Sequence, residues 1–391
     1  MRNQTFRIAV RQFPPFESAI HQQWQAFEAE AQTGLTLDLV PLDLHDLEQA
    51  LFTTNGMANG DWDVAFINTD WIAAMHAQRA AADLAPLLKS DPPEGYPQAW
   101  SPSLLRLQRM GDAILGVPYH DGPECLIYRR DLIDDPPTTW DSFHALARSL
   151  TRPGLHGTGL SGTAFAAFPD GHNTVYDFLL QLWTRNGELF APDGRVQFHT
   201  PEAEAALTFY RDIVTDPTST HPASPTLDSV ASGNLFASGS VAMMVNWFGF
   251  AAYAQTSPGS AVRGLVEIAP IPHAPGGRSA SLNVYWILSI ASGSPHPGIA
   301  WQFLRHTQTP AMDLLTSTCG AIGTRRSTWQ NQALNSEIPF YHQLEALHQN
   351  AREIPQRPDW PQIAATIDRL VTAVVTTTKP IANLLAEATS P

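Results

Sequence analysis

The chain has 391 residues, of which 43% are apolar and only 15% are charged, and its 37 acidic side chains outnumber 23 Lys and Arg residues, for a formal net charge of −14. The length predicts two or three domains. The acidic balance argues against nucleic acid and anionic membrane surfaces as partners, because their phosphates favour a basic face. Two cysteines, Cys125 and Cys319, exclude a disulfide scaffold and a four-thiolate zinc site, and leave open one bridge or two buried thiols.

The first strand and helix patterns appear at once. Residues 6–10 form a short β-type run, and apolar residues then recur at helical spacing from Ile20 to Ala31. A rough alternation over 35–42 predicts a second strand, and the apolar run 64–67 predicts a third.

A second helix pattern, residues 44–51, lies between the second and third strands. The resulting βαβαβ order implies a parallel sheet covered by helices. In such sheets ligands bind beyond the carboxyl ends of the strands, so 12–16 and 68–71 are the first places to look for a site.

The middle and end of the chain are more helical. Thr138 with Asp141 predicts a capping box, and Thr200 with Pro201 predicts another helix start. A final helix pattern covers 361–388. Loops rich in Pro, Ser and Thr are expected at 215–226, 256–260 and 269–281.

No membrane segment or export signal is predicted. The start of the chain lacks an apolar stretch of about 7–15 residues, which a signal peptide needs. The densest apolar stretch, 241–254, is shorter than the roughly 20 residues of a spanning helix. We therefore expect a soluble chain.

The segment 116–150 carries a recognisable series of motifs. They read G-x-P-Y at Gly116–Tyr119, Y-x-x-D-L at Tyr128–Leu132 and P-x-T-W at Pro137–Trp140. Six further motifs precede or follow this segment along the chain, at Asp61–Val64, Ala82–Leu87, Asn186–Phe190, Thr200–Leu207, Phe236–Met243 and Pro297–Leu304. Each is weak alone, but together they span nearly the whole chain. The sequence therefore resembles the bacterial extracellular solute-binding proteins of family 1, the maltose-binding-protein-like group.

Two departures from the family pattern stand out. The usual G-x-P-x-R is replaced by a stretch without proline, Gly320–Arg325. The family's export signal is also missing, which fits either a chain whose signal was removed, the favoured interpretation, or a homologue that stays inside the cell.

The resemblance implies an α/β fold of the periplasmic-binding-protein type II class, with two α/β lobes joined by a hinge and a ligand cleft between them. The crossings are expected near 117–124, 266–274 and 320–326. The first lobe would comprise 1–119 plus 273–322 and the second 120–272 plus 323–391. Such a protein closes on a solute, delivers it to the permease subunits of an ABC importer, works as a periplasmic or extracytoplasmic monomer, and uses no cofactor or metal.

The family ligand is most often a sugar or oligosaccharide. The 11 Trp, 8 Tyr and 18 Phe residues could cover the apolar faces of sugar rings. The candidate ligand-binding residues, placed by the family positions, are Gln12, Phe13, Asn68, Asp70, Trp71, Tyr119, His120, Asp121, His172, Asn173, Tyr176, Asn246, Trp247, Phe248, Asn283, Tyr285, Trp286 and Trp360, with Glu17 and Asp170 nearby. The segment 246–248 is the favoured one.

Structural roles compete with these assignments. Asp70 could cap a helix, Asp121 could form an Asx-turn before Gly122, and His120 could be structural. Any of the aromatic residues could be core.

Three other functions stay open. A glycosidase needs two carboxylates about 5–10 Å apart, which scattered acids do not exclude, although no HExxH, GxSxG or GxxxxGKS motif appears. An intracellular sugar sensor would explain the missing signal. Another solute class is possible too: a polyol, a polyamine, a metal chelate, or an acidic sugar held by Arg11 and Arg325.

Overall fold

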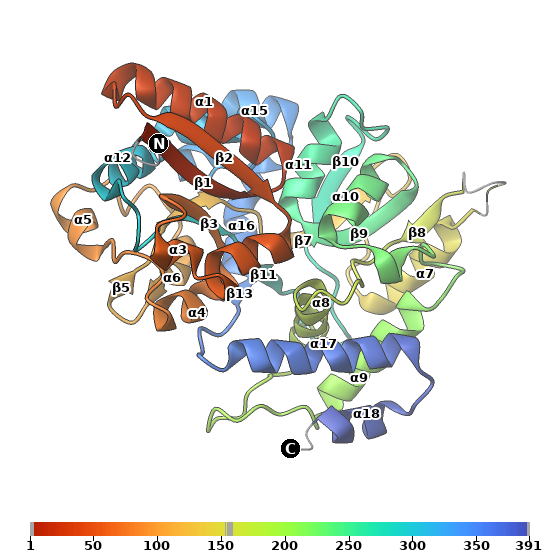
Figure 1. The fold of residues 1–391 in the computed structure, drawn as a ribbon. Helices are drawn as coiled ribbons and strands as arrows, with labels where there is room; N and C mark the ends of the chain where they lie inside the picture. The colour runs from red at the N-terminus through yellow and green to blue at the C-terminus, as the bar shows by residue number, and fades with distance from the viewer. Residues whose placement is uncertain (1–3, 153, 155–158, 389–391) are drawn as a thin grey trace. The chain divides into compact units, whose positions relative to one another are not determined.

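The computed structural model describes residues 4–152, 154 and 159–388. Its contacts divide the chain into two compact units. Unit 1 comprises 1–122, 283–348 and 353–358, and unit 2 comprises 123–282, 349–352 and 359–391. Each unit has its own sheet with helices around it (Figure 1).

This division differs from the expected lobe boundaries at four stretches: 120–122, 323–348 and 353–358 belong to unit 1, and 273–282 belongs to unit 2. Residues 323–348 pack with unit 1, because the backbone N–H of Thr324 donates to Asp313 at 2.8 Å and Tyr341 shares a hydrogen bond with Ser317. Residues 273–282 pack with unit 2, where Ser281 donates to the carbonyl of Glu124.

The sheet of unit 1 is mixed, with two parallel and two antiparallel strand pairs. Its strands, in spatial order, are β2 (Thr36–Leu42), β1 (Thr5–Arg11), β3 (Val64–Asn68), β12 (Trp286–Ile290) and β6 (Val117–His120). β1 is parallel to β2 and β3, while β12 is antiparallel to both β3 and β6. The carboxyl ends of β1, β3 and β6 and the start of β12 therefore share one edge. The three predicted opening strands are confirmed.

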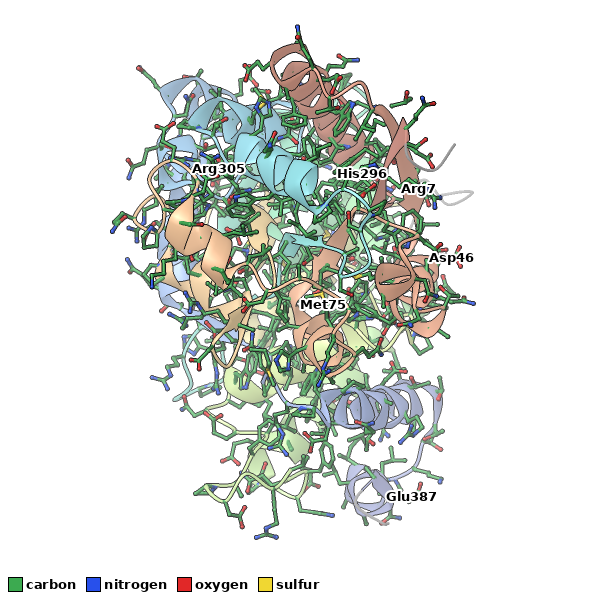
Figure 2. The ribbon with its side chains drawn as sticks, turned by 60° about the vertical axis from the view of Figure 1, so that its left-hand side comes forward. Arg7, Asp46, Met75, His296, Arg305 and Glu387 are labelled. Atoms are coloured by element: carbon green, nitrogen blue, oxygen red, sulfur yellow. The ribbon has the colours of Figure 1, made fainter. Side chains whose placement is uncertain are left out.

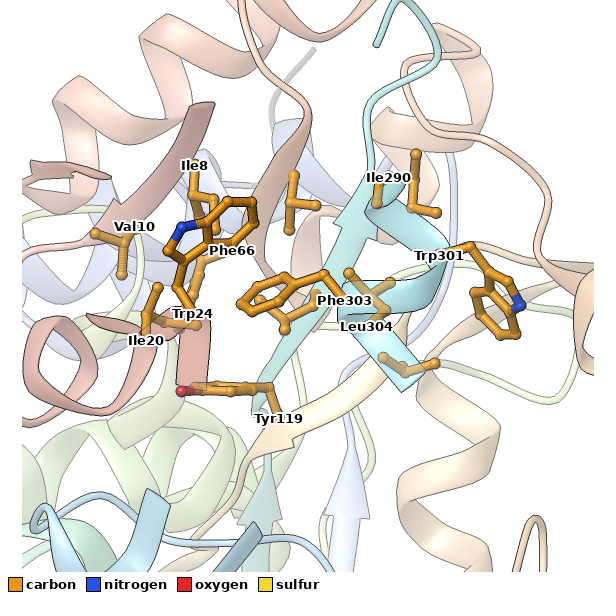
Figure 3. Packing of buried hydrophobic residues seen from close by; sticks show 14 of the residues in the cluster. Ile8, Val10, Ile20, Trp24, Phe66, Tyr119, Ile290, Trp301, Phe303 and Leu304 are labelled. Carbon is orange, nitrogen blue, oxygen red and sulfur yellow. The ribbon is translucent and has the colours of Figure 1, made fainter. Parts of the chain in front are cut away.

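Helix α1 (Pro14–Ala31) covers one face of this sheet with its predicted apolar side. Trp24 stacks on Phe6 at 4.7 Å. It also meets Phe303 of α12 (Pro297–Thr307) at 5.3 Å, and both of these rings are labelled in Figure 3. Burying rings of this size contributes roughly 2–3 kcal/mol each. The helix ends with Gln32 in a left-handed conformation, at φ 50°.

The shorter helices of unit 1 follow the chain in order. They are α2 (Leu44–Glu48), continued by a π-helical turn at Gln49–Thr53, then α3 (Gly56–Asn59), α4 (Ile72–Ala77), α5 (Ala85–Ser90), α6 (Pro102–Leu107), α13 (Pro310–Thr318), α14 (Arg326–Trp329), α15 (Gln332–Glu337) and α16 (Leu344–Gln349). The second helix expected over 44–51 thus begins as an α-helix and finishes as a π-helix. Two short strands, β4 (Arg109–Met110) and β5 (Ala113–Ile114), form a hairpin.

The opposite edge of this sheet is tied by Asp63. Its carboxylate accepts from the backbone N–H of Arg7 at 2.9 Å and from Ser294 at 2.6 Å, and its Oδ1 lies 3.1 Å from Nδ1 of His296. Arg7 and His296 lie close together in Figure 2. These hydrogen bonds occupy the carboxylate of Asp63 with structural contacts at the amino-terminal end of β3. The candidate site therefore lies at the other end of the sheet, where β1, β3 and β6 finish.

Unit 2 has a four-stranded sheet. Its order is β10 (Val266–Ala269), β7 (Glu124–Arg129), β9 (Val241–Trp247) and β8 (Ser161–Thr163). β7 is antiparallel to β10 and β9, and β8 is parallel to β9. A separate pair joins β11 (Ser281–Asn283) to β13 (Ala351–Glu353).

The helices of unit 2 are α7 (Trp140–Leu150), α8 (Asn173–Trp183), α9 (Pro201–Val214), α10 (Ser229–Ala237), α11 (Phe248–Thr256), α17 (Trp360–Thr376) and α18 (Ile381–Ala388). α17 packs on α8, α9 and α18 (Figure 1). The single helix expected over 361–388 is thus two helices, because Pro380 lacks the N–H that a continuous helix needs.

Two helix starts test the capping predictions. Thr200 accepts from the N–H of Ala203 at 3.1 Å, which confirms the start of α9 at Pro201. The capping box of α7 uses Thr139 and Ser142 rather than Thr138 and Asp141, so that prediction was wrong by one residue. The serine hydroxyl can both accept and donate, which completes the box without a carboxylate.

Both cysteines are free thiols. Cys125 is fully buried on β7, and burial raises the pKa of its thiol well above the ordinary range. Cys319 is half-buried beside Ser18 and Gln22. Of the two interpretations left open, the unbridged one is the correct one.

Candidate functional site

The site edge of unit 1 centres on Trp286. This residue begins β12, and its Cα partners are Asn68 of β3 and His120 of β6. A register shift follows it, and bulges of this kind re-aim a side chain at the end of a ladder. The indole is half-buried and meets the ring of Trp71 edge-on at 5.9 Å and that of Phe16 at 6.3 Å. The edge therefore carries an aromatic cluster with one partly exposed tryptophan.

The polar residues after β3 are held in a tight turn. Asn68 is the residue that caps it, accepting from the N–H of Asp70 at 3.3 Å. Thr69 exchanges hydrogen bonds with the backbone of Tyr285, at 3.0 and 3.1 Å. Trp71 is buried against Phe52, whose ring centroid lies 5.9 Å away. The cap is thus made by Asn68, and the half-buried Asp70 stands in the turn it creates.

The residues after β1 lie at the same edge. Gln12 is exposed, and its backbone N–H extends the ladder by donating to the carbonyl of Leu42. Phe13 is half-buried at the start of α1, edge-on to Phe16 at 5.1 Å. Glu17, also half-buried, follows in the first turn of the same helix. These side chains stay candidates for ligand contact.

Two predicted tyrosines are part of the core instead. Tyr119 is 2% exposed and donates to Oε1 of Gln23 at 2.9 Å, and burial raises its pKa well above the ordinary value. Tyr285 is 1% exposed and donates to the backbone carbonyl of Leu104. Because each hydroxyl already has a buried partner, we assign both rings to packing.

His120 and Arg325 also have internal partners. Nδ1 of His120 accepts from the N–H of Ile322 at 2.9 Å. Arg325 is 4% exposed, donates to the carbonyls of Glu94 and Gln308, and lies over the ring of Trp100 at 4.7 Å. The guanidinium is thus used inside unit 1, which removes the argument for an anionic sugar at this residue. Arg11, at the end of β1, is half-buried.

The environment of His120 predicts a loss of stability in acid. Desolvation lowers its pKa to about 4 from 6.5, with the neighbouring Asp121 opposing the shift. Between these two values the unfolded chain binds a proton that the folded chain excludes. The contribution is therefore fully present above pH 6.5 and falls as the pH drops toward 4, by about 1–3 kcal/mol.

This loss is measured by urea unfolding at pH 7.0 and pH 4.5. The control is His120→Asn, whose side-chain oxygen can still accept from Ile322 but does not titrate. We expect the wild-type protein to lose more stability than this variant over the interval. Equal losses in the two proteins would contradict the assignment.

A buried series of hydrogen bonds links two segments of unit 1, 1–122 and 283–348, close to the residues at which each segment ends. Asp121 Oδ2 lies 2.6 Å from Nε2 of His348, whose Nδ1 lies 2.9 Å from the hydroxyl of Ser103. The imidazole also stacks on Trp329 at 5.1 Å. The Asx-turn interpretation is wrong: Oδ2 of Asp121 faces His348, and among the described residues its Oδ1 has no hydrogen-bond partner. We call Asp121, His348 and Ser103 the boundary triad.

Asn283 lies at another boundary of unit 1. It is 1% exposed, and within the described ranges neither its amide nitrogen nor its amide oxygen has a hydrogen-bond partner. An unpaired buried amide costs on the order of 1–3 kcal/mol, so a water molecule or a ligand is expected to satisfy it.

In unit 2 the candidate residues gather where β9 ends. Trp247, the last residue of that strand, is half-buried, and its ring meets Tyr176 of α8 edge-on at 5.7 Å. The hydroxyl of Tyr176 lies 3.2 Å from Nδ1 of His172. The structure therefore brings His172, Tyr176 and Trp247 together, although more than 70 residues separate the last two in the sequence.

The other predicted residues of unit 2 have structural roles. Asn246 faces away from Trp247. Its side-chain amide donates to the backbone carbonyl of Ser229 and to the hydroxyl of Ser232, each at 3.0 Å. Phe248 and Trp360 are buried, at 0% and 4% exposure. Neighbouring residues on a strand point to opposite faces, so Trp247 and Asn246 cannot share a site.

Asp170 and Asn173 organise the start of α8. The carboxylate of Asp170 accepts from the backbone N–H groups of His172 and Asn173, both at 2.9 Å, and from the side-chain amide of Asn173. This is the charge that a helix start favours. Both residues therefore position α8.

Two acidic residues were not among the predicted ones: Glu124, which is paired with Trp247, and Asp177, whose charge acts on Glu124. Glu124 is the Cα partner of Trp247 on β7 and is 5% exposed. Asp177 follows Tyr176 on α8 and accepts from the hydroxyl of Tyr210 at 2.7 Å. The available signal was a carboxylate at the head of the apolar strand 124–128, which is unusual for a buried position.

A separate hollow of about 540 Å³ lies between α7 and α9. Its lining residues are Asp141, His144, Ala145, Arg148, Phe209, Asp212 and Thr215. His144 and Arg148 both contact Asp216, at 2.9 and 2.7 Å. This hollow shares no residue with the predicted site.

No helix in the described ranges is long and apolar enough to cross a membrane. They also contain no group of three or more His, Cys, Asp or Glu side chains arranged to hold a metal ion.

Comparison with known proteins agrees with the motif order. A family profile described as bacterial extracellular solute-binding protein matches residues 12–313. A probable ABC transporter-binding protein of Deinococcus radiodurans is 24% identical over 336 residues, which cover 82% of this chain and 76% of that protein.

Solved structures match over almost the whole length. The maltose-bound MalE protein of T. maritima has a TM-score of 0.86 at 23% identity, covering 98% of each chain. A solute-binding protein of Agrobacterium radiobacter in complex with ribitol has a TM-score of 0.87 at 22% identity, covering 98% of this chain and 96% of that one. The fold is thus that of the type II periplasmic binding proteins, and family and fold are those of binding proteins rather than enzymes. With most of its length matched by the family profile, this chain belongs to the bacterial extracellular solute-binding proteins.

Proposed function

We propose that this chain is the solute-binding component of an ABC importer, and that it captures a sugar or polyol outside the cytoplasm and delivers it to membrane permease subunits. The observation that carries the ligand class is the half-buried Trp247 at the end of β9, edge-on to Tyr176. The exposed part of a half-buried aromatic ring can cover the apolar C–H side of a polyhydroxylated ligand.

Unit 1 supplies a second surface of the same kind. Trp286 is half-buried, and the exposed Gln12 and half-buried Asp70 lie at the same sheet edge as potential hydrogen-bonding groups. An aromatic surface with a few polar groups is the usual composition of a small-molecule site.

The matched structures support the ligand class. They include complexes with maltose, ribitol, alpha-D-tagatose and D-mannitol. These compounds share a chain or ring of adjacent hydroxyls. We therefore place mono- and disaccharides and linear polyols first in a ligand screen.

The test is a thermal-shift screen of that panel followed by calorimetry. A ligand at about 100 times its Kd stabilises the folded state by roughly 2.7 kcal/mol. Trp247→Ala should weaken binding of the best ligand by about 10- to 100-fold, because burying a large apolar side chain against the ligand contributes roughly 1.5–3 kcal/mol.

The matched control is Phe209→Ala, which removes another half-buried aromatic ring of unit 2, one that lines the separate hollow. It should bind the ligand like the wild-type protein. If Trp247→Ala and Phe209→Ala bind equally well, Trp247 is not a ligand contact. If no sugar or polyol shifts the wild-type protein, the proposed ligand class is wrong.

A further inference from the structure

The strand register of unit 2 places an acidic side chain beside the proposed aromatic surface. Glu124 and Trp247 are directly opposed across β7 and β9. Opposed residues point to the same face of a sheet, with Cβ atoms about 5 Å apart. On this face Trp247 contacts Tyr176 of α8. Glu124 therefore points toward α8, on the same side as the two rings.

The carboxyl group of Glu124 is buried and incompletely bonded. The residue is 5% exposed, and among the described residues its Oε2 atom has no hydrogen-bond partner. Ser281 bonds only its backbone carbonyl. Burial, followed by the charge of Asp177, raises the pKa of Glu124 well above its ordinary value.

Asp177 adds a second carboxyl to the same group. It accepts a hydrogen bond from Tyr210 of α9, and burial raises its pKa to about 7, with Asp170 contributing in the same direction. The charged groups that perturb Glu124, Asp177 and Tyr210 are all acids within the part of the chain that the structure describes. Ionising the neighbouring carboxyls of Glu124, Asp177 and Asp170 together is electrostatically costly, because no cation is among the described groups that perturb them.

We infer that the group formed by Glu124, Asp177, Tyr176 and Trp247, the acid–aromatic site, binds the protonated nitrogen of an amino sugar or amino polyol. A ligand ammonium would pair with the unsatisfied carboxyl oxygen of Glu124, and aromatic faces attract cations as well. This inference rests on the proposed function and narrows its ligand to an aminated member of the polyhydroxylated class.

The experiment compares twin compounds that differ in one group. Calorimetry at pH 6.5 and low salt would use 1-amino-1-deoxysorbitol against sorbitol, and glucosamine against glucose. In at least one pair we expect the amine to bind 10-fold or more tightly than its hydroxyl twin. Glu124→Gln, which keeps the shape of the side chain, should remove most of that preference while changing the affinity for the neutral twin less than 3-fold.

Two further measurements separate charge recognition from loss of structure. Asp141→Asn makes the same charge change at an exposed residue of α7. This variant should still bind the amine more tightly than its hydroxyl twin. Binding of the amine should also release protons, detected as a dependence of the enthalpy on the buffer, because an ammonium favours the ionised form of both carboxyls.

The outcomes distinguish the two proposals. If the neutral twins bind as tightly as the amines, or if the preference survives in Glu124→Gln, the inference is wrong and the proposed function stands. If none of the four compounds binds, and the sugar and polyol panel fails too, both are wrong.

Discussion

Replacing Asp313 by alanine is expected to lower the free energy of unfolding by about 3–5 kcal/mol, because several buried donors lose one shared acceptor. Asp313 lies on α13 and is 3% exposed. Its carboxylate accepts from the backbone N–H groups of Thr324 and Arg325, at 2.8 and 3.1 Å, and from the hydroxyl of Thr328. Urea unfolding followed by tryptophan fluorescence measures the loss.

Two control variants are compared with Asp313→Ala in the same unfolding experiment. Asp313→Asn retains one side-chain oxygen and should lose less stability than the alanine variant. Asp193→Ala removes an exposed carboxylate paired with Arg195 and should leave the unfolding midpoint unchanged. A loss below about 1 kcal/mol for Asp313→Ala would show that the freed donors find other partners, since unsatisfied buried groups cost more than that.

The second large effect is expected at the boundary triad. The side chains of Asp121 and His348 are 0% and 2% exposed and lie 2.6 Å apart. Replacing either one alone leaves a buried polar partner unpaired, which costs about 3–5 kcal/mol when that partner is charged. His348→Phe and Asp121→Leu should therefore each lower the unfolding free energy by that amount.

The double variant tests whether the two side chains act together. His348→Phe keeps a ring to stack on Trp329, and with Asp121→Leu it replaces the pair by apolar groups. We expect the double variant to be at least about 2 kcal/mol more stable than the sum of the single effects implies. Strict additivity would mean that the 2.6 Å contact is energetically unimportant.

Much of the fold was predictable because it depends on local patterns. Buried strands leave apolar runs, so β1 and β3 were found at 6–10 and 64–67, and the cap at Thr200 was read correctly from the sequence. The capping box at Thr139 was missed by one residue because several hydroxyls stand side by side there.

Sequence position indicated which candidate residues follow a strand, and only some of those candidates lie together in the structure. Trp247 and Tyr176 do lie together at a sheet end. Tyr119, Tyr285 and Arg325, however, have internal partners far away in the sequence, at Gln23, Leu104 and Gln308. Sequence position shows that a residue follows a strand, but not which distant group will occupy its polar atoms. For the same reason, the sequence did not predict that residues 323–348 pack with unit 1.

The position of β12 in the sheet of unit 1 has a consequence for biosynthesis. This strand lies between β3 and β6, yet it is synthesised long after both of them. At translation rates of about 5–20 residues per second, the interval is on the order of 10–30 seconds. During that time the backbone N–H and C=O groups along one edge of β3 and of β6 have no partner strand, and unpaired strand edges of this kind draw chains into aggregates. Rapid production of this protein should therefore depend on chaperones that shield those edges until Trp286–Ile290 emerges from the ribosome.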